Sequence, residues 1–259
     1  MDWLKSQLDT RLGQYTLGVA AHLLLLLGWY LFVRLGDVPK FVMPSPADTF
    51  GALMKPNYDW WKNSLVTGTE IFGGYALALA VGVLLALLFT WSKLLEALVL
   101  PLLVTLNMIP KVALGPLIIV WFKYGVFPNT LMAFSIAVFP ILLTTARGLR
   151  ETEPELLDLV RSLRGSRWQL FTKIQLPGAL PYVFSGMKVA AILAVAGAIV
   201  GEFLGSDRGL GYLMLQVQVT LDTPAMFMAV MLITLLGMVL YGIVLLLERA
   251  LVAKDSRLG

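Results

Sequence analysis

The sequence predicts an all-α integral membrane protein with six transmembrane helices and a cytoplasmic loop between the fourth and the fifth. Hydrophobic residues make up 58% of its 259 residues, charged residues make up only 14%, and the mean hydropathy is +0.81. Soluble domains are typically about 45–50% apolar and about 25% charged. The chain therefore carries more apolar surface than one water-soluble core could bury. Its apolar residues gather in long runs, and a helix needs about 20 of them to cross a bilayer.

Six runs meet that requirement. The first follows Lys5 and Arg11, as a signal peptide would, but its apolar run is too long and no small-x-small cleavage site follows it. We therefore expect it to remain as a membrane helix. The predicted spans are 17–35, 68–92, 97–122, 124–146, 182–205 and 223–247.

Charges inside these spans are few. The third span carries Lys111 between Pro110 and Pro116, and the prolines are expected to free backbone carbonyls there. The fifth span carries Lys188 near its inner end, where we expect it to snorkel, and Glu202 near its outer end. The second, fourth and sixth spans contain the charge-free runs 71–92, 124–146 and 223–247.

The distribution of Lys and Arg predicts the orientation. With the N-terminus in the cytoplasm, the inner segments hold twelve Lys or Arg residues and the outer segments hold six. Cytoplasmic loops normally carry this excess, so both termini and the loop 147–181 are expected on the cytoplasmic side. The net charge of +4 needs no nucleic-acid partner to explain it.

Several chemical functions are disfavoured by composition. The chain has no cysteine, and its one histidine, His22, lies inside an apolar run where it is more often a packed side chain than a ligand. Neither a metal site nor Cys/His catalysis is expected, and an intramembrane enzyme would also need clustered carboxylates that the spans do not suggest. A self-sufficient channel or secondary transporter would account for six spans and Lys111, but not for the features of the loop 147–181.

That loop carries the signals of two short helices. A capping box, in which a Ser or Thr and a Glu or Gln three residues later satisfy the first backbone N–H groups, begins each one. An apolar stripe in the second helix could rest on the membrane domain while the opposite face meets a partner protein. An interfacial helix held by anionic lipid would show the same pattern. The boxes are Thr152 with Glu155 and Ser166 with Gln169, the turn is Arg164-Gly165, the stripe is Trp168, Phe171 and Ile174, and Pro177 and Pro181 are expected to end the second helix.

The same segment resembles the EAA loop of bacterial ABC importer permeases of the binding-protein-dependent transport family. That pattern is Glu-Ala-Ala, three residues, Gly, nine residues and Ile-x-Leu-Pro. Here the triplet is Asp158-Leu159-Val160 and the closing motif is Ile174-Gln175-Leu176-Pro177. Two positions depart from it, because the triplet is not Glu-Ala-Ala and Arg164 occupies the glycine position, with Gly165 one residue later.

Further stretches extend the resemblance over most of the chain. "FVMPSPADTF" is similar to the nitrate, sulfonate and taurine permease branch. "IPKVALGPLIIVWFKYG" and "GEFLGSDRGLGYL" are closer to permeases assigned to thiamine-pyrimidine-precursor or riboflavin uptake. The implied solute is a small organic or anionic molecule such as a vitamin precursor, a sulfonate or nitrate.

The resemblance implies one permease domain over 1–259 with the type I ABC importer fold, in the bacterial inner membrane. It implies a second permease copy, making a homodimer, and two separate ATPase subunits that bind ATP and Mg. A periplasmic or lipid-anchored binding protein would deliver solute. The chain itself has no "GxxxxGK[ST]" phosphate loop, which agrees with an ATPase on another polypeptide and with a permease that is not an enzyme.

The resemblance also suggests roles for individual residues. Lys111 could bind an anionic solute, pair with Glu202 or bond the freed carbonyls, and Glu202 could instead snorkel. For the loop, a merely solvated charged face is the alternative to ATPase docking. The candidates are Asp158, Arg161, Ser162, Arg164 and Gly165 for docking, Asn107, Pro110, Lys111 and Glu202 for the pathway, and Asp207 and Arg208 for binding-protein contact.

Small residues recur at every fourth position of the fifth span. This spacing lets helix backbones approach closely. Packing within one subunit, a face on the pathway and a face on a paired subunit all fit the pattern. The residues are Ala190, Ala194 and Ala198 in one series and Gly197, Gly201 and Gly205 in another.

Overall fold

The computed structural model describes residues 11–151, 156, 158, 160 and 162–252. Within these residues every regular element is a helix, as predicted. The chain divides into two compact units. Unit 1 is Met1–Trp60 with Met214–Val230, and unit 2 is Trp61–Leu213 with Met231–Gly259.

Unit 1 begins with the first membrane helix, α2 (Arg11–Leu35), and continues through three short helices. Ser45 caps the first of these, because its hydroxyl accepts a hydrogen bond from the Asp48 backbone N–H. Trp29 of α2 donates its indole N–H to the Pro44 carbonyl at 2.9 Å and packs its ring on Phe227, with centroids 5.8 Å apart. The short helices are α3 (Pro46–Gly51), η1 (Ala52–Met54) and η2 (Pro56–Tyr58).

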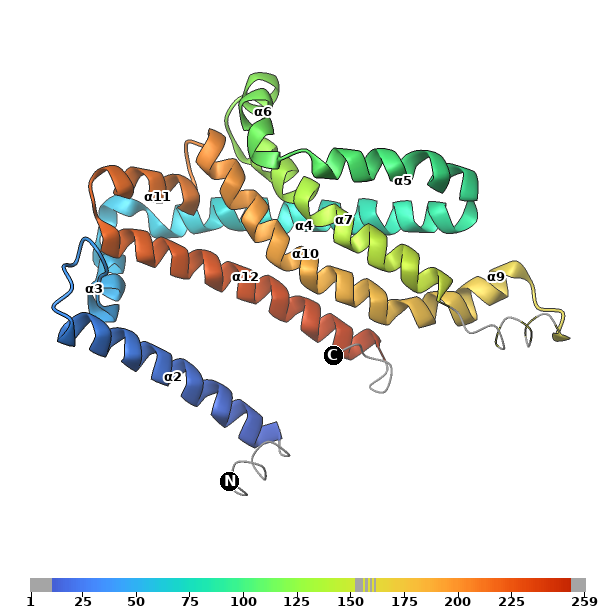
Figure 1. The fold of residues 1–259 in the computed structure, drawn as a ribbon, viewed down its shortest axis with the longest axis horizontal. Coiled ribbons are helices and arrows are strands. Elements are labelled where there is room, and N and C mark those ends of the chain that lie inside the picture. The colour runs from blue at the N-terminus through green and yellow to red at the C-terminus, as the bar shows by residue number, and fades with distance from the viewer. Residues whose placement is uncertain (1–10, 152–155, 157, 159, 161, 253–259) are drawn as a thin grey trace. The chain divides into compact units, whose positions relative to one another are not determined.

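Unit 2 holds most of the remaining helices, which Figure 1 labels in chain order. Helices α11 and α12 run from one unit into the other. The bounds are α4 (Trp60–Trp91), α5 (Lys93–Met108), η3 (Lys111–Leu114), α6 (Gly115–Phe122), α7 (Val126–Arg150), α9 (Arg167–Leu170), η4 (Phe171–Gln175), α10 (Leu176–Gly205), α11 (Leu210–Val219) and α12 (Thr223–Leu251).

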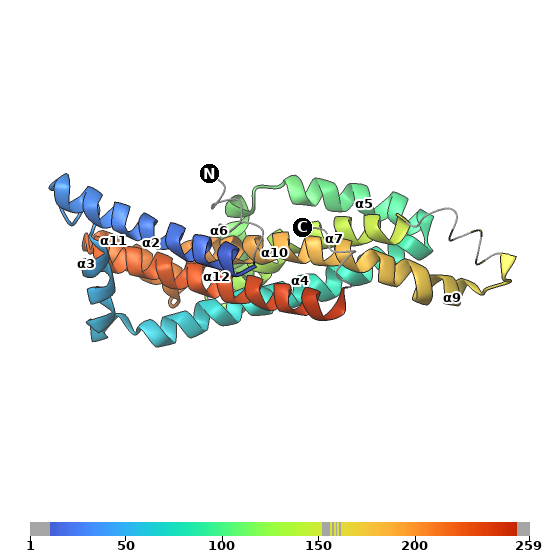
Figure 2. The same ribbon diagram turned by 90° about the horizontal axis from the view of Figure 1, so that it is seen from below.

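The centre of unit 2 is the packing of α10 against α7, which run side by side in Figure 1 and Figure 2. A Cβ added at Gly197 would lie 2.6 Å from the Ala133 Cα, and one at Gly201 would lie 3.0 Å from the Asn129 Cα. Only glycine permits this approach. Of the three roles expected for these small residues, the structure therefore shows packing within the subunit. The alanines of the other series, Ala190, Ala194 and Ala198, are buried in the same core.

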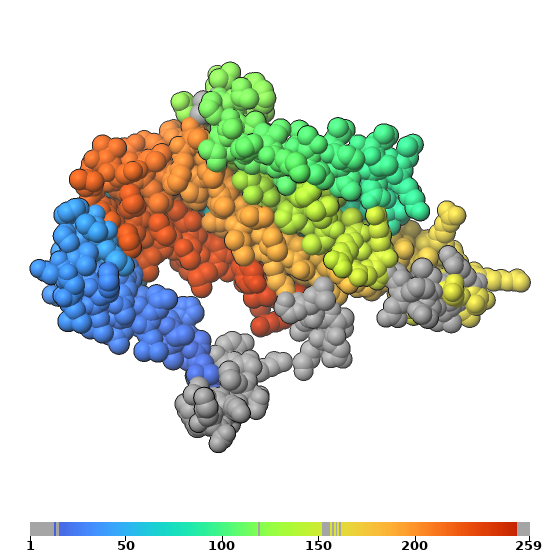
Figure 3. All heavy atoms as spheres, in the orientation of Figure 1, coloured from blue at the N-terminus to red at the C-terminus, as the bar shows by residue number. Residues whose placement is uncertain are grey.

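Five helices are long and apolar enough to cross a membrane, and a sixth is complete if a bent pair counts as one span. The pair is Lys93–Met108 with Lys111–Phe122, bent by 85°. The prediction of six spans is thus confirmed, with the third span broken. In Figure 3, α5 and α6, coloured green, lie at the surface of unit 2. Leu98 and Leu102 of α5 and Val120 of α6 are among their exposed apolar side chains.

Two helices extend beyond the predicted spans: α4 begins at Trp60, before the span predicted from 68, and α7 continues to Arg150, after the span predicted to end at 146. Pro177 and Pro181 do not end a helix, because one helical path runs over Arg167–Gly205 with both prolines inside it. The path contains a π-helical turn, η4, which ends two residues before Pro177 and includes Lys173, the residue four positions before that proline. Such a turn relaxes the i→i−4 ladder that a proline would otherwise break.

Candidate functional site

The break in the third span lies at Pro110. α5 ends at Met108, and η3 starts at Lys111 after Pro110, whose ring nitrogen has no hydrogen to donate. The Lys111 ammonium donates to the Leu106 carbonyl at 2.8 Å. The lysine therefore satisfies a carbonyl freed by the break, which is one of the three roles expected for it.

A cavity of about 200 Å³ lies beside this break. Asn107 and Lys111 line it from α5 and η3, so the structure brings two of the predicted pathway residues together. The rest of the wall is largely apolar. It includes Leu85, Leu103, Phe134, Val138 and Phe139.

Glu202, the other predicted pathway residue, lies in a different place. Its side chain is buried, so it does not snorkel. Its Oε1 accepts a hydrogen bond of 2.5 Å from the Thr67 hydroxyl, and its Oε2 accepts from the backbone N–H groups of Gly211 and Tyr212. The pairing of Lys111 with Glu202 is thus not made.

Sequence reasoning missed Glu70, which lies against Glu202. Glu70 is fully buried on α4, and its Oε1 accepts a hydrogen bond of 2.9 Å from the Asn129 side chain on α7. The expectation that the spans hold no clustered carboxylates was therefore wrong. A signal was present in the sequence: Glu70 continues a series at every fourth position, Gly74, Ala78 and Gly82, all of which are buried.

The loop from Ser206 to Gly209 carries the predicted binding-protein contacts. Asp207 and Arg208 are exposed and pair with each other at 3.6 Å. The loop is fastened to α4, because the Gly209 N–H donates to the Asn63 side chain at 2.9 Å and the Leu210 N–H donates to Thr67 at 2.8 Å. Gly209 has φ +106°, a conformation that favours glycine.

Part of the loop 147–181 has the predicted structure. The capping box of Ser166 and Gln169 is present in both directions, as predicted. Arg164 has φ +52°, and the Gly165 N–H closes the turn on the Val160 carbonyl at 2.8 Å. The left-handed residue is therefore Arg164, which occupies the glycine position of the EAA pattern.

Four of the docking candidates, Asp158, Ser162, Arg164 and Gly165, are exposed. The Ser162 hydroxyl donates to the Asp158 carbonyl at 2.9 Å. The fifth candidate, Arg161, lies outside the described residues, as does the capping box of Thr152 and Glu155.

Phe171 attaches this segment to the helix bundle. Its ring is nearly buried and packs on Trp91 at the end of α4 and on Trp168, each at a centroid distance of 5.8 Å. Within the predicted stripe, Trp168 remains 65% exposed. The segment around α9 thus has one side that packs on the helix bundle and one side that is exposed.

Ion pairs link several helices of unit 2. Arg150 pairs with Glu96 at 2.5 Å, and hydrogen bonds from Arg147 and then Tyr182 lower the pKa of Glu151. Lys188 pairs with Glu248 at 3.0 Å, with only 14% and 5% of the two side chains exposed. Its predicted snorkelling is therefore wrong, because a partner on α12 is within reach.

A metal site has no support in the described part of the chain, where no group of three or more His, Asp or Glu side chains could hold an ion. The cavity can recognise a small molecule through one cation and one amide beside its apolar wall. Helix α10 can transmit a movement from one of its ends to the other.

The family described as "Binding-protein-dependent transport system inner membrane component" matches residues 78–253. The chain belongs to this family. The permease is 36% identical to a probable ABC transporter permease protein of Haemophilus influenzae, over 84% of this chain and 89% of that one. It is 31% identical to the formylaminopyrimidine transport permease protein ThiX of Halalkalibacterium halodurans, over 88% and 92%. It is 36% identical to the riboflavin transport system permease protein RibX of Chloroflexus aurantiacus, over 90% and 88%.

The fold agrees with this family. A structure of the MetNI methionine ABC transporter in an inward-facing conformation matches with a TM-score of 0.51 and 21% identity, over 74% of this chain and 94% of that one. The protein is thus the permease subunit of an ABC importer, a multi-pass membrane protein with the type I importer fold, and the resemblance to its branch is confirmed.

Proposed function

We propose that the permease forms half of a solute pathway, pairs with a second copy of itself, and is driven by two separate ATPase subunits docked on the loop 147–181. ATP and Mg belong to those subunits. The observation that carries the proposal is the helical path over Arg167–Gly205, which joins the exposed capping-box turn at one end to the buried Glu202 at the other.

This path supports a simple means of coupling. The docking candidates present exposed polar groups, and Phe171 fixes the start of the path to α4. A push on the turn would therefore move α10, and α7 with it because their backbones touch. At the far end the same movement reaches Glu202 and the loop that carries Asp207 and Arg208, where the binding protein would deliver solute.

For the solute we propose a small heterocycle of the vitamin-precursor class. The cavity beside Lys111 supports this choice, since Phe134 and Phe139 offer flat apolar surfaces and Asn107 and Lys111 offer polar contacts. Relatives named for formylaminopyrimidine and riboflavin transport agree with it. A sulfonate or nitrate is the second candidate, favoured by the cationic ammonium of Lys111 and by a sulfonate-permease relative.

We place both termini and the loop 147–181 in the cytoplasm of a bacterial cell with the permease in its inner membrane. The support is the two-to-one excess of Lys and Arg on that side, twelve residues against six.

Cross-linking tests the docking. The natural chain has no cysteine, so Ser162→Cys introduces a unique thiol on an exposed turn. With the co-expressed ATPase, a thiol cross-linker should join the two subunits, and it should fail to do so for Val219→Cys, which is 85% exposed elsewhere. Equal capture at both positions, or none at Ser162 in an active complex, would refute docking on this loop.

A further inference from the structure

Glu202 has the hydrogen bonds of an ionised carboxylate. Its two oxygens accept from three donors, the Thr67 hydroxyl and the backbone N–H groups of Gly211 and Tyr212. The two backbone donors belong to the first turn of α11, where unpaired N–H groups and the helix dipole favour a negative charge. Glu202 therefore caps α11 from the neighbouring helix.

Only one of the two carboxyl oxygens of Glu70 has a hydrogen-bond partner among the described residues. Its Oε1 accepts from Asn129, but its Oε2 is fully buried and receives no hydrogen bond from any donor that the structure describes. What lies within hydrogen-bonding reach of the Glu70 side chain is the carboxyl group of Glu202. An ionised carboxylate has no hydrogen to donate, so two carboxyl groups can face each other in this way when a proton or a cation lies between them.

We propose that Glu70 and Glu202 form a proton-binding site, in which Glu70 carries a proton on Oε2 and donates it to Glu202. With this assignment Glu70 Oε2, the one carboxyl oxygen of the cluster without a hydrogen-bond partner in the described part of the chain, becomes a donor. The pair then carries one negative charge instead of two. Two adjacent buried charges without a cation would be strongly unfavourable, and within the described residues no Lys or Arg forms an ion pair with either glutamate.

The packing favours a proton over a metal ion. A Cβ added at Gly209 or Gly211 would overlap the Glu202 carboxyl group, so backbone closes tightly on that side. On the other side a Cβ at Gly201 would meet Asn129. The site brings together a hydroxyl, an amide and two carboxyls at hydrogen-bonding distances, without the surrounding space that an ion and its water ligands would take.

The proton joins four parts of unit 2. Glu70 and Thr67 lie on α4, Asn129 on α7 and Glu202 on α10, and α11 is held through its first turn. The other titratable groups on these elements are Lys62 and Tyr75 on α4, Arg147 and Arg150 on α7, Tyr182 and Lys188 on α10, and Tyr212 on α11, whose backbone makes the contact. Asp207 and Arg208, in the loop before α11, are exposed and paired with each other.

A movement that parts α10 from α4 would admit water and allow the proton to leave. Low pH should therefore favour the closed arrangement seen here and high pH the opened one. This pH dependence of the movement rests on the proposed transport cycle. The proton shared by Glu70 and Glu202 does not depend on that cycle.

Infrared spectroscopy of the purified full-length permease tests the site without any transport assay. A protonated carboxyl group has a carbonyl stretch distinct from that of a carboxylate, and at neutral pH we expect this band in the natural protein and its loss in Glu70→Gln. Glu248→Gln is the matched control, since that buried glutamate pairs with Lys188 and should not contribute to the band. No band in the natural protein, or an unchanged band in Glu70→Gln, would overturn the proposal.

Thermal unfolding against pH provides the second readout. The midpoint of the natural protein should fall as pH rises, and in Glu70→Gln this slope should vanish, since the amide donates to Glu202 without a titrating proton. If Glu70→Gln does not fold, loss of the natural protein's infrared band on alkaline titration decides the matter. A midpoint that follows Na⁺ concentration at constant pH and ionic strength would show a metal ion in place of the proton.

Discussion

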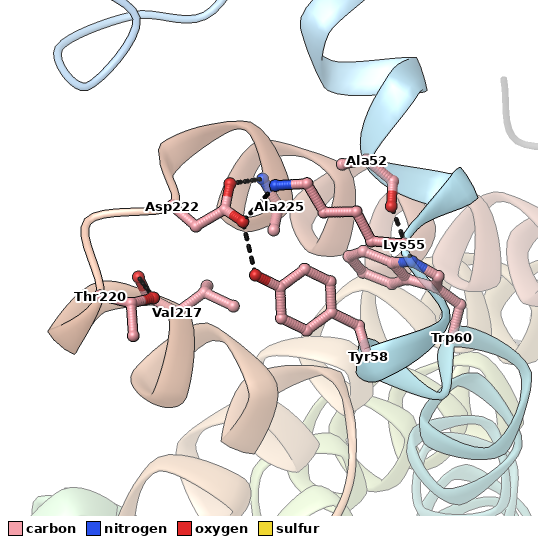
Figure 4. A network of polar contacts seen from close by, with 8 residues as sticks. All are labelled: Ala52, Lys55, Tyr58, Trp60, Val217, Thr220, Asp222 and Ala225. Carbon is pink, nitrogen blue, oxygen red and sulfur yellow. Dashed lines mark hydrogen bonds and ion pairs between the residues drawn. The ribbon is translucent and has the colours of Figure 1, made fainter.

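The Lys55 ammonium lies 2.5 Å from Asp222 Oδ2, across 167 positions of sequence (Figure 4). The Tyr58 hydroxyl donates to the same oxygen at 2.5 Å, and Asp222 Oδ1 accepts from the Ala225 N–H at the start of α12. This network fastens the segment before α4 to the start of α12 within unit 1. Burial raises the pKa of Asp222, but the hydrogen bonds from Lys55 and Tyr58 outweigh it and leave the pKa below the ordinary value of 3.8.

The Asp222 network should weaken in acid. Because the pKa of Asp222 is lowered in the folded chain, its contribution is complete above pH 3.8 and is lost as pH falls through the folded-state value. Asp222→Asn should remove about 1 kcal/mol of stability at neutral pH, the scale of a partly exposed charge-assisted bond. Hydrogen exchange over 52–60 measures the loosening. Asp48→Asn is the control, since its partner Lys40 is 73% exposed, and an equal effect there would contradict a special role for Asp222.

Arg164→Gly should stabilise the turn of the loop 147–181. A left-handed conformation costs an L-residue about 1–2 kcal/mol, part of which glycine loses again in the unfolded chain. We expect a net gain of about 0.5–1 kcal/mol, seen as slower proteolysis of this loop. Arg167→Gly, at the first residue of α9, should speed proteolysis instead. Faster cleavage of Arg164→Gly would mean that the arginine side chain holds the turn.

Arg164→Gly also separates stability from docking. If the guanidinium contacts the ATPase, the variant should have the more stable turn and yet a weaker complex. Affinity of the purified permease for its ATPase, compared with that of Arg164→Lys, measures this. Unchanged affinity in both variants would remove Arg164 from the docking surface.

Lys111→Met should lower uptake while the complex stays assembled. The change removes a cation from the cavity and leaves the Leu106 carbonyl with the longer hydrogen bond from the Ile109 N–H, at 3.4 Å. A solute held by the ammonium would lose about 1.5–3 kcal/mol of binding, the scale of a hydrogen bond to a charged group. Uptake of the cognate solute should therefore fall about tenfold or more. Lys123→Met, an exposed lysine in the turn after α6, is the control.

Combining Lys111→Met with Glu202→Gln tests the separation of the two sites. Since Lys111 bonds the Leu106 carbonyl and Glu202 bonds Thr67, the two stability changes should add. Mutual rescue in the double variant would show that the two side chains pair after all.

Gly197→Ala should destabilise the bundle. The added methyl group would lie 2.6 Å from the Ala133 Cα, and forcing α7 and α10 apart costs about 1–3 kcal/mol. Gly178→Ala, on the same helix with open space around it, should be neutral or stabilising by up to about 1 kcal/mol. Thermal midpoints of the detergent-solubilised variants compare the two. A stable Gly197→Ala protein would contradict the backbone contact.

Features that depend on neighbours in the chain could be predicted from the sequence. The apolar runs determined the membrane helices, because span length and hydropathy are local properties. Pro110 indicated the break in the third span, and Ser166 with Gln169 indicated a helix start, because each effect acts within one helical turn. The EAA-like spacing identified the class of protein for the same reason.

Only the tertiary structure decided which distant groups meet. Periodicity shows that one face of a helix is buried but not which helix covers it, so the glycines of α10 could not be assigned to α7 beforehand. Likewise, the contact of Thr67 with Glu202 spans 135 positions and that of Lys55 with Asp222 spans 167. Such contacts depend on the registers of several packed helices at once, and no local pattern records those registers.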